Sequence, residues 1–162
     1  LSASLFHAIT ATALLTAVSF SSPIPGTVLR VPLTPAGDTP LQVVEGICRV
    51  CNAETVRPLT DTVVVAAPTR QDYAIEVDVI LYEDTDAASA QSQLKSALET
   101  FAAEKRAMLG LDIIRSEIVK TARMSMVYDV TVVEPADNIV ITEEEFANCT
   151  GITVNITGFN RG

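Results

Sequence analysis

The chain contains few of the residue types on which active sites and nucleic-acid platforms commonly depend. Its 162 residues include no tryptophan, one histidine and three cysteines, and aromatic residues make up 5%. So few aromatic side chains leave little material for the stacking surfaces that bind single-stranded nucleic acid. Basic residues are also scarce, because 11 Lys and Arg stand against 20 Asp and Glu, for a net charge of −9. Phosphate backbones repel such a chain, so we expect no nucleic-acid partner.

Sequence motifs of the common catalytic families are missing as well. The chain has no G-x-x-x-x-G-K-[ST], G-x-G-x-x-G, G-x-S-x-G or H-E-x-x-H pattern, each of which arranges groups for a defined chemistry. The single histidine, His7, has no carboxylate within eight residues on either side. A general base needs a neighbour that orients it, so a packed or surface histidine is the better interpretation. We predict that the chain is not an enzyme and has no catalytic residue, cofactor or small-molecule substrate.

Two of the three cysteines form a C-x-x-C pattern, Cys48 to Cys51. This spacing occurs in metal and redox sites, but a zinc site needs two further ligands and the chain has only one histidine. Both cysteines lie in a segment with a helical pattern, where residues three apart share a face and free cysteine packs as a small hydrophobe. We predict that both are reduced, buried and free of metal.

The apolar opening of the chain is neither a convincing secretory signal nor a membrane span. The first basic residue is Arg30, so the segment lacks a basic leading region, and serine and threonine interrupt its apolar run. We therefore predict no membrane partner. Because the chain begins with Leu1, we expect it to be a processed product or a fragment of a longer protein.

Hydrophobic residues make up 48% of the chain and charged residues 19%, which is enough to build a core. The charge is uneven. Residues 1–69 hold three basic and four acidic side chains, for a net charge of −1, and residues 70–162 hold eight and sixteen, for −8. A Pro-Thr-Arg joint at residues 68–70 separates two strand-like runs. We predict an α+β fold with two domains, a first unit over 1–68 and a second unit with an acidic surface over 70–162.

The first unit has the predicted order α-β-β-α-β. We expect a helix over residues 4–13, strands over 15–21 and 27–33 around a Pro-Ile-Pro-Gly turn, and a third strand over 63–66. Thr39-Pro40-Leu41-Gln42 has the pattern of a capping box and predicts a helix that runs to about residue 53. Its expected buried residues are Leu41, Val44, Ile47, Cys48 and Cys51. These elements predict a short mixed or antiparallel sheet with helices on one face.

The second unit has the predicted order β-α-α-β-β. Residues 73–82 alternate as a half-buried strand, and acidic residues 83–86 precede a long helix that Gly110 ends. Asp112 is expected to cap a shorter helix, and strands follow at residues 128–132 and 152–156. The long helix carries an apolar stripe at helical spacing, formed by Ala90, Leu94, Ala97, Leu98, Phe101 and Met108.

Three adjacent carboxylates, Glu143, Glu144 and Glu145, raise the question of a cation site. Consecutive residues of a helix or a strand do not converge on one point, so a solvated charged face is the better interpretation. We predict no metal there.

The segment Val56-Arg57-Pro58-Leu59-Thr60-Asp61 carries a charged, stiff corner before the third strand. Proline holds the preceding Arg57 extended, and Asp61 is close enough in sequence to pair with it across the turn. Arg57, Pro58 and Asp61 are therefore candidate residues either for a rigid wall against a neighbouring protein or for an intramolecular turn brace, and the sequence leaves both open.

The same corner resembles a known family. "VRPLTD" leading into "TVVVAAPT", together with "FHAITATALLTAVSFSSPIPGTVLRVPLT" upstream, is similar to the baseplate J-like proteins of contractile-tailed phages. Downstream, "ALETFAAEKRAMLGLDIIRSEIVKTA" and "VYDVTVVEPADNIVIT" resemble later segments of that family. The resemblance extends over nearly the whole chain and corresponds to the C-terminal part of a typical member. It departs at Met124-Ser125-Met126, where the family pattern has a glycine before the valine.

This resemblance implies a structural component of a phage tail baseplate wedge, which acts in assembly through protein–protein contacts and not through catalysis. The implied partners are other tail baseplate proteins and symmetry copies of the chain itself, in a virion tail baseplate made in the cytoplasm of the bacterial host. Isolated, such a fragment is expected to be mostly monomeric or weakly associated. The alternatives are a related contractile injection apparatus, a small α+β ligand-binding or regulatory module, and an enzyme that uses His7 and the acidic cluster.

Overall fold

The computed structural model describes residues 17–24, 27–34, 41–42, 44–46 and 62–161. By its internal contacts the chain divides into two compact units. The first comprises Leu1–Arg70, Ala107–Leu111 and Thr142–Phe146, and the second comprises Gln71–Arg106, Asp112–Ile141 and Ala147–Gly162. The predicted domains 1–68 and 70–162 stay a prediction, which limited proteolysis followed by mass spectrometry tests.

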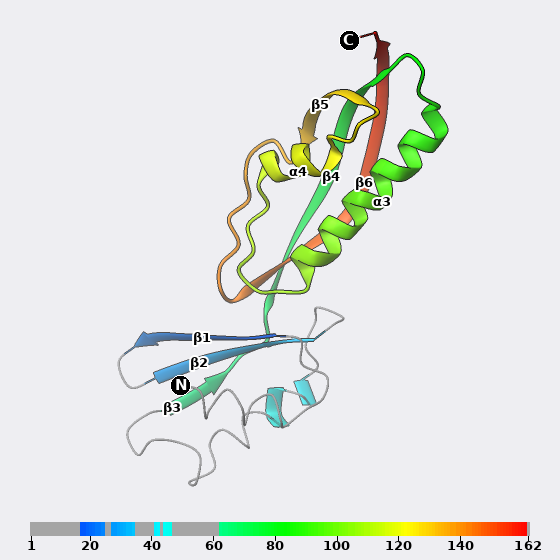
Figure 1. Cartoon of the computed structure of the whole chain (residues 1–162). Coiled ribbons are helices and arrows are strands. Elements are labelled where there is room, and N and C mark those ends of the chain that lie inside the picture. The colour runs from blue at the N-terminus through cyan, green and yellow to red at the C-terminus, as the bar shows by residue number, and fades with distance from the viewer. Residues whose placement is uncertain (1–16, 25–26, 35–40, 43, 47–61, 162) are drawn as a thin grey trace. The chain divides into compact units, whose positions relative to one another are not determined.

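The first unit contains a three-stranded sheet in the order β1-β2-β3 (Figure 1). Strands β1 (Ala17–Ile24) and β2 (Thr27–Leu33) pair antiparallel, and β3 (Thr62–Val65) pairs with β2 in parallel. Strand β2 has its predicted bounds and β3 lies within one residue of them, whereas β1 continues to Ile24, into the segment that was predicted as a turn. The sheet is therefore mixed, and Leu33 at the end of β2 is fully buried.

The predicted helices of the first unit are only partly visible. Residues 41–42 and 44–46 are helical, while Ile47 and the helix predicted over residues 4–13 lie outside the described residues. The side chain of Leu41 is 70% exposed, so its predicted burial is wrong. Val44 is half-buried, so the helical turn buries its apolar residues less deeply than their periodicity suggested.

One glycine of the first unit has a conformation that other residues rarely adopt. Gly110 has a φ of 69°, its N–H donates to the Glu145 carbonyl at 3.0 Å, and a Cβ built on it would lie 3.4 Å from Glu143 Cα. The preceding helix ends at Arg106. The predicted left-handed glycine is therefore present, but it closes the following loop and does not cap the helix.

Except for the first two residues of β4 and of β6, the second unit contains β4 (Thr69–Tyr82), α3 (Ala87–Arg106), α4 (Arg115–Ala122), β5 (Val127–Glu134) and β6 (Glu145–Asn160), in the predicted order β-α-α-β-β. Its strands form a second sheet in the order β5-β4-β6, and β4 and β5 are antiparallel. Hydrogen bonds from Asn148, Asn155 and Thr157 reach positions on β4 that rise with residue number, so β6 runs parallel to β4 (Figure 1). The predicted α+β fold is confirmed.

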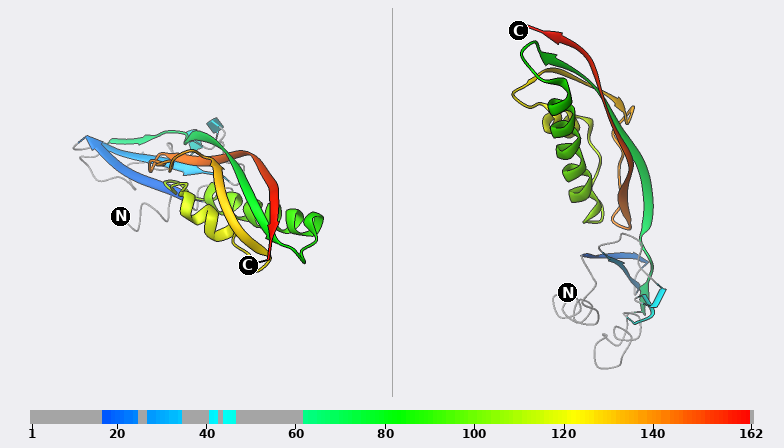
Figure 2. Two further views of the ribbon diagram at one scale, coloured as in Figure 1. Left: turned by 90° about the horizontal axis from the view of Figure 1, so that it is seen from above. Right: turned by 90° about the vertical axis from the view of Figure 1, so that its right-hand side faces the viewer.

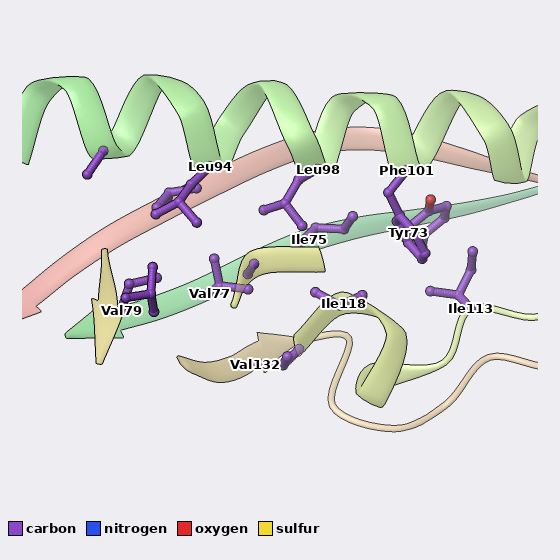
Figure 3. Packing of buried hydrophobic residues seen from close by; sticks show 14 of the residues in the cluster. Tyr73, Ile75, Val77, Val79, Leu94, Leu98, Phe101, Ile113, Ile118 and Val132 are labelled. Atoms are coloured by element: carbon purple, nitrogen blue, oxygen red, sulfur yellow. The ribbon is translucent and has the colours of Figure 1, made fainter. Parts of the chain in front are cut away.

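A continuous core lies between this sheet and α3. Figure 3 shows the inward residues of β4 facing the predicted stripe of α3. Alternation along β4 and helical spacing along α3 account for this arrangement, because each periodicity places its apolar residues on one side. The fully or nearly fully buried residues of the two elements are Tyr73, Ile75, Val77, Val79, Leu81, Ala90, Leu94, Leu98, Phe101 and Ala102.

The beginning of α3 agrees with the sequence prediction, and its end does not. A carboxylate oxygen of Asp86 accepts a hydrogen bond from the Ser89 N–H at 2.9 Å, as an N-terminal cap does. Lys105, in the last turn, pairs with Glu117 of α4 at 2.7 Å. Met108 lies beyond the helix and is 54% exposed, so its predicted place in the buried stripe is wrong.

Helix α4 is not capped by Asp112 as predicted. The helix begins at Arg115, and Asn138 Oδ1 accepts the hydrogen bond of the Arg115 N–H at 2.9 Å. Asp112 Oδ1 instead accepts from the Ile141 N–H at 2.8 Å. A residue distant in sequence thus supplies the cap, and Asp112 joins two loops.

The turn before β5 accommodates the sequence that departs from the family pattern. The Val127 N–H donates to the Met124 carbonyl at 3.0 Å, and among the described residues no residue other than glycine has a positive φ. The turn at Met124-Ser125-Met126 therefore needs no glycine.

Candidate interaction surface

The candidate site residues from the sequence analysis, Arg57, Pro58 and Asp61, lie outside the described residues. Their role as an interface wall or a turn brace stays a prediction. The same holds for the predicted states of His7, Cys48 and Cys51, of which a zinc assay on purified protein tests the metal-free state. The candidate surface is therefore built from the second unit.

The sheet of the second unit has one covered and one open face. Helices α3 and α4 lie on the same side of the sheet, and no described element of this unit covers the other side (Figures 1 and 2). The residues of β4 that alternate with the core residues point to this open face. They include Glu76, Asp78 and Ile80, which are half-buried, and Tyr82, which is 37% exposed.

Acidic residues of β4 on the open face are held by asparagines of β6. The Asn155 side-chain amide donates to Glu76 Oε1 at 2.9 Å and to Asp78 Oδ1 at 3.0 Å. Asn148 donates in the same way to Asp72 Oδ1 at 2.6 Å. Hydrogen bonds to a charged acceptor are stronger than neutral ones, so these contacts fix three carboxylates along one side of the sheet.

Aromatic rings extend the open face toward the end of β4. Tyr82 and Tyr128 are in edge-to-face contact, with ring centroids 5.7 Å apart and an interplanar angle of 88°. Tyr128 is 36% exposed, and Phe159, which strand alternation from Asn155 places on the same face, is 50% exposed. Rings of this kind bring contact area at low entropic cost, and tyrosine is enriched in protein interfaces.

The two edges of the sheet differ in how they are protected. At the β5 edge, the Arg115 guanidinium donates to the Val132 carbonyl and to the Ala136 carbonyl, both at 2.6 Å. At the β6 edge, the Gln91 side-chain amide donates to the Val154 carbonyl at 2.9 Å. The edge formed by the shorter strand, β5, is thus covered by a charged guanidinium group, whereas the edge formed by the longer strand, β6, has a neutral amide as its donor.

The buried hydroxyl of Tyr73 on β4 and the half-buried thiol of Cys149 on β6 lie close together. Burial raises the pKa of the Tyr73 hydroxyl above its ordinary value, and the nearby Cys149 thiol adds to the effect. Burial likewise raises the pKa of the Cys149 thiol, although backbone hydrogen bonds at Gly151 and Ile75 work in the opposite direction. Both groups are therefore uncharged at neutral pH, and the thiolate form that would act as a nucleophile is scarce.

The acidic run is arranged as a charged surface. Glu143 and Glu144 are exposed at a turn, while Glu145 Oε2 accepts hydrogen bonds from the N–H and the hydroxyl of Thr142, both at 2.9 Å. Within the described ranges, no three His, Cys, Asp or Glu side chains converge as metal ligands would. No described helix is both long and apolar enough to cross a membrane.

Sequence reasoning missed Arg115, Asn148 and Asn155. The alternation of β6 could have indicated that Asn155 lies on the polar face, but its partners on β4 are more than 75 residues away. No sequence pattern around Arg115 indicates that it protects the edge of β5, because this role depends on where the first turn of α4 lies relative to that strand.

Comparison with known proteins places this geometry in a family. The family described as "Baseplate J-like protein C-terminal domain" matches residues 73–155, which include most of the second sheet and both of its helices. Among curated proteins, no sequence matches the chain.

A similar solved structure is described as "Cryo-EM structure of the anti-feeding prophage (AFP) baseplate, 6-fold symmetrised". The identity is 11%, the TM-score is 0.53, and the likeness covers 88% of this chain and 35% of that chain. At this identity the likeness shows the fold alone, and this chain spans only a part of that longer protein. The resemblance found in the sequence is confirmed by the family match. With 83 of its 162 residues matched, the chain belongs to the baseplate J-like protein family through that family's C-terminal domain.

Proposed function

We propose that the chain is part of a structural component of a phage tail baseplate wedge and acts in baseplate assembly through protein–protein contacts. The observation that carries this proposal is the family match over residues 73–155. The open face of the sheet supports it, because its exposed rings and fixed carboxylates serve no purpose in the core. The partners are other baseplate proteins and symmetry copies, in the virion tail, with synthesis and assembly in the host cytoplasm.

The proposed role is a rigid contact surface and not catalysis. The raised pKa of the Cys149 thiol disfavours its use as a nucleophile, which supports a non-enzymatic role. Under this proposal no cofactor is needed. A screen of small molecules for thermal stabilisation of the chain addresses the alternative of a ligand-binding module, which predicts a saturable shift in melting temperature.

A related contractile injection apparatus is the second candidate. The solved structure of similar fold comes from a prophage baseplate described as anti-feeding. The two candidates differ in what the finished particle contains, because a phage tail is joined to a DNA-filled head.

Deletion of the coding sequence tests the proposal. We expect the deleted strain to produce no complete baseplates by electron microscopy, and expression of the full-length protein in trans to restore them. Normal numbers of complete particles in the deleted strain would overturn the proposal. Particles that carry DNA-filled heads would assign the protein to a phage, and particles without heads to an injection apparatus.

The predicted corner at residues 57–61 belongs to the same proposal. If Arg57 and Pro58 form a wall against a neighbour, the double change Arg57→Ala, Pro58→Gly impairs assembly more than it lowers the melting temperature of the isolated chain. Normal particle yield with a lowered melting temperature would make the corner a turn brace only.

A further inference from the structure

Among the described residues, the free edge of β6 has one neutral side-chain donor, that of Gln91, and no charged donor against pairing with another strand. β6 is the terminal strand of the β5-β4-β6 order and is 16 residues long. Residues 149–159, CTGITVNITGF, contain no charged residue and no proline. Natural sheets normally shield such edges with charges, prolines or covering segments, because an exposed edge pairs readily with another chain. The opposite edge has that shielding from Arg115.

Helix α3 runs beside this edge and presents a second stripe to it. Two shallow grooves of about 540 Å³ and about 500 Å³ lie between α3 and β6, and they share Lys95 and Ile152 in their walls. Most residues of α3 in these walls recur at spacings of four and three on a helix face beside the core stripe, and the last of them, Ala102, is itself buried. These wall residues are Ala88, Gln91, Ser92, Lys95, Glu99 and Ala102.

The charges on this stripe favour a symmetric arrangement. Lys95 and Glu99 are one turn apart on α3, both exposed, and neither takes part in an ion pair of the described structure. In a two-fold arrangement of antiparallel helices centred between them, Lys95 of each copy faces Glu99 of the other. The stripe is therefore complementary to itself, as an interface between identical copies must be.

We propose that the β6 edge pairs with the β6 edge of a second copy of this chain. The two strands run antiparallel about a two-fold axis near Ile152, which joins the two sheets into one and places the two α3 helices side by side. Main-chain hydrogen bonds hold the strands, and two reciprocal Lys95–Glu99 pairs fix the register. In the single chain, the Gln91 amide donates a hydrogen bond to the Val154 carbonyl. In the dimer, a backbone N–H of the second copy donates to this carbonyl in its place.

A second copy fits this edge better than a charged partner does. Each copy carries a net charge of −9, so two copies repel each other over most of their surfaces. The uncharged stretch at residues 149–159 is where close approach costs least. The association is weak because the contact is small, and it agrees with the expectation that the isolated chain is mostly monomeric or weakly associated.

This inference rests on the proposed function for its role, since it supplies one of the symmetric contacts within a baseplate. Its physical test is separate. The oligomeric state of the isolated chain tests the strand pairing, whereas particle assembly in the deleted strain tests the proposed function, so either can fail alone.

Sedimentation velocity over a wide range of protein concentration is the first measurement. We expect a monomer–dimer equilibrium that Lys95→Glu or Glu99→Lys weakens about tenfold or more, because each single change places like charges opposite each other. The double variant Lys95→Glu, Glu99→Lys restores the original dimerisation. The matched controls are Lys120→Glu and Glu104→Lys, which make the same charge changes at exposed positions outside the grooves and leave dimerisation unchanged. Circular dichroism confirms that every variant is folded.

A disulfide trap is the second measurement and does not depend on charge. In a background with all three natural cysteines replaced by serine, Ile152→Cys, which the two-fold axis places opposite its own copy, is expected to form a covalent dimer under mild oxidation much faster than Thr131→Cys does. Thr131 is an exposed residue of β5 on the same sheet and serves as the control. A chain that stays monomeric throughout, a dimer unaffected by the single charge changes, or equal rates of cross-linking would each overturn the proposal.

Discussion

The two faces of the β5-β4-β6 sheet differ although they share the same strands. Along β4, Ile75, Val77 and Val79 are at most 1% exposed and pack beneath α3 (Figure 3). Their neighbours Glu76 and Asp78 point to the open face and bind Asn155. The covered face must satisfy close packing, so its residues report the fold. The open face is released from that demand, and under the proposed function its carboxylates and rings contact other subunits.

The difference between the two faces predicts which mutations lower the stability of the chain and which impair assembly. Changes on the covered face remove buried apolar area and leave cavities, which lowers the free energy of unfolding. Changes on the open face remove little buried area, so under the proposed function they should affect chiefly the contacts with other subunits.

The largest effect is expected on the covered face. Leu98→Ala removes a fully buried side chain of α3 and should lower the free energy of unfolding by about 2–5 kcal/mol, measured by urea denaturation. Ile80→Ala, on the open face of the same sheet, is the control and should cost clearly less. Equal losses from the two changes would contradict the distinction between the faces.

The edge of β5 should give the next largest effect. Arg115→Ala leaves the Val132 and Ala136 carbonyls without their charged donor, and we expect a loss of about 1–3 kcal/mol. Arg115→Lys keeps the charge but not the paired geometry, so it should recover only part of the loss. Arg123→Ala, at an exposed position just after α4, should change the free energy of unfolding little. A loss from Arg123→Ala as large as that from Arg115→Ala would show that general charge, and not these two bonds, is responsible.

A smaller effect is expected from the asparagine that holds the open face. Asn155→Ala removes both amide hydrogen bonds to Glu76 and Asp78, and we expect a loss of about 0.5–1.5 kcal/mol. Higher salt should reduce the loss, because it screens the two carboxylates from each other once their shared donor is gone. Thr153→Ala, on the same strand, provides the comparison, and a salt-independent loss would contradict the electrostatic explanation.

The smallest effect concerns the half-buried thiol of Cys149. Because the pKa of Cys149 is raised in the folded chain, the unfolded thiol ionises first as the pH rises. The contribution of Cys149 to stability is therefore complete below the ordinary thiol pKa and is lost as the pH rises through the folded value. Stability measured against pH should fall in the alkaline range less steeply for Cys149→Ser than for the natural chain. Identical alkaline profiles would contradict this.

Much of the fold could be predicted because its signals are local. The alternation over residues 73–82 gave the inward face of β4, and the acidic residues before Ala87 gave the beginning of α3 through Asp86. These signals depend on neighbours in sequence, which a periodicity reports directly.

The remaining features depend on partners distant in sequence. Asn138 caps α4 from 23 residues away, and Asp112, the expected cap, binds Ile141 instead. The parallel direction of β6 and its contacts with β4 join residues more than 75 positions apart. The candidate surface was missed for the same reason, because an open sheet face exists only once the strand order is known.

Assembly of particles by a protein with an altered open face tests the central claim most directly. The double change Tyr82→Ala, Tyr128→Ala removes the exposed ring pair, and Val140→Ala, at a side chain that is 75% exposed in a loop, is the matched control. Complete baseplates would be counted by electron microscopy in a deleted strain that expresses each full-length variant, and the melting temperature of each isolated chain would be measured beside it. We predict that the double variant loses most complete baseplates while its melting temperature falls by only a few degrees, and that the control assembles normally. Normal baseplate numbers with the double variant would contradict the claim that the open face is a contact surface.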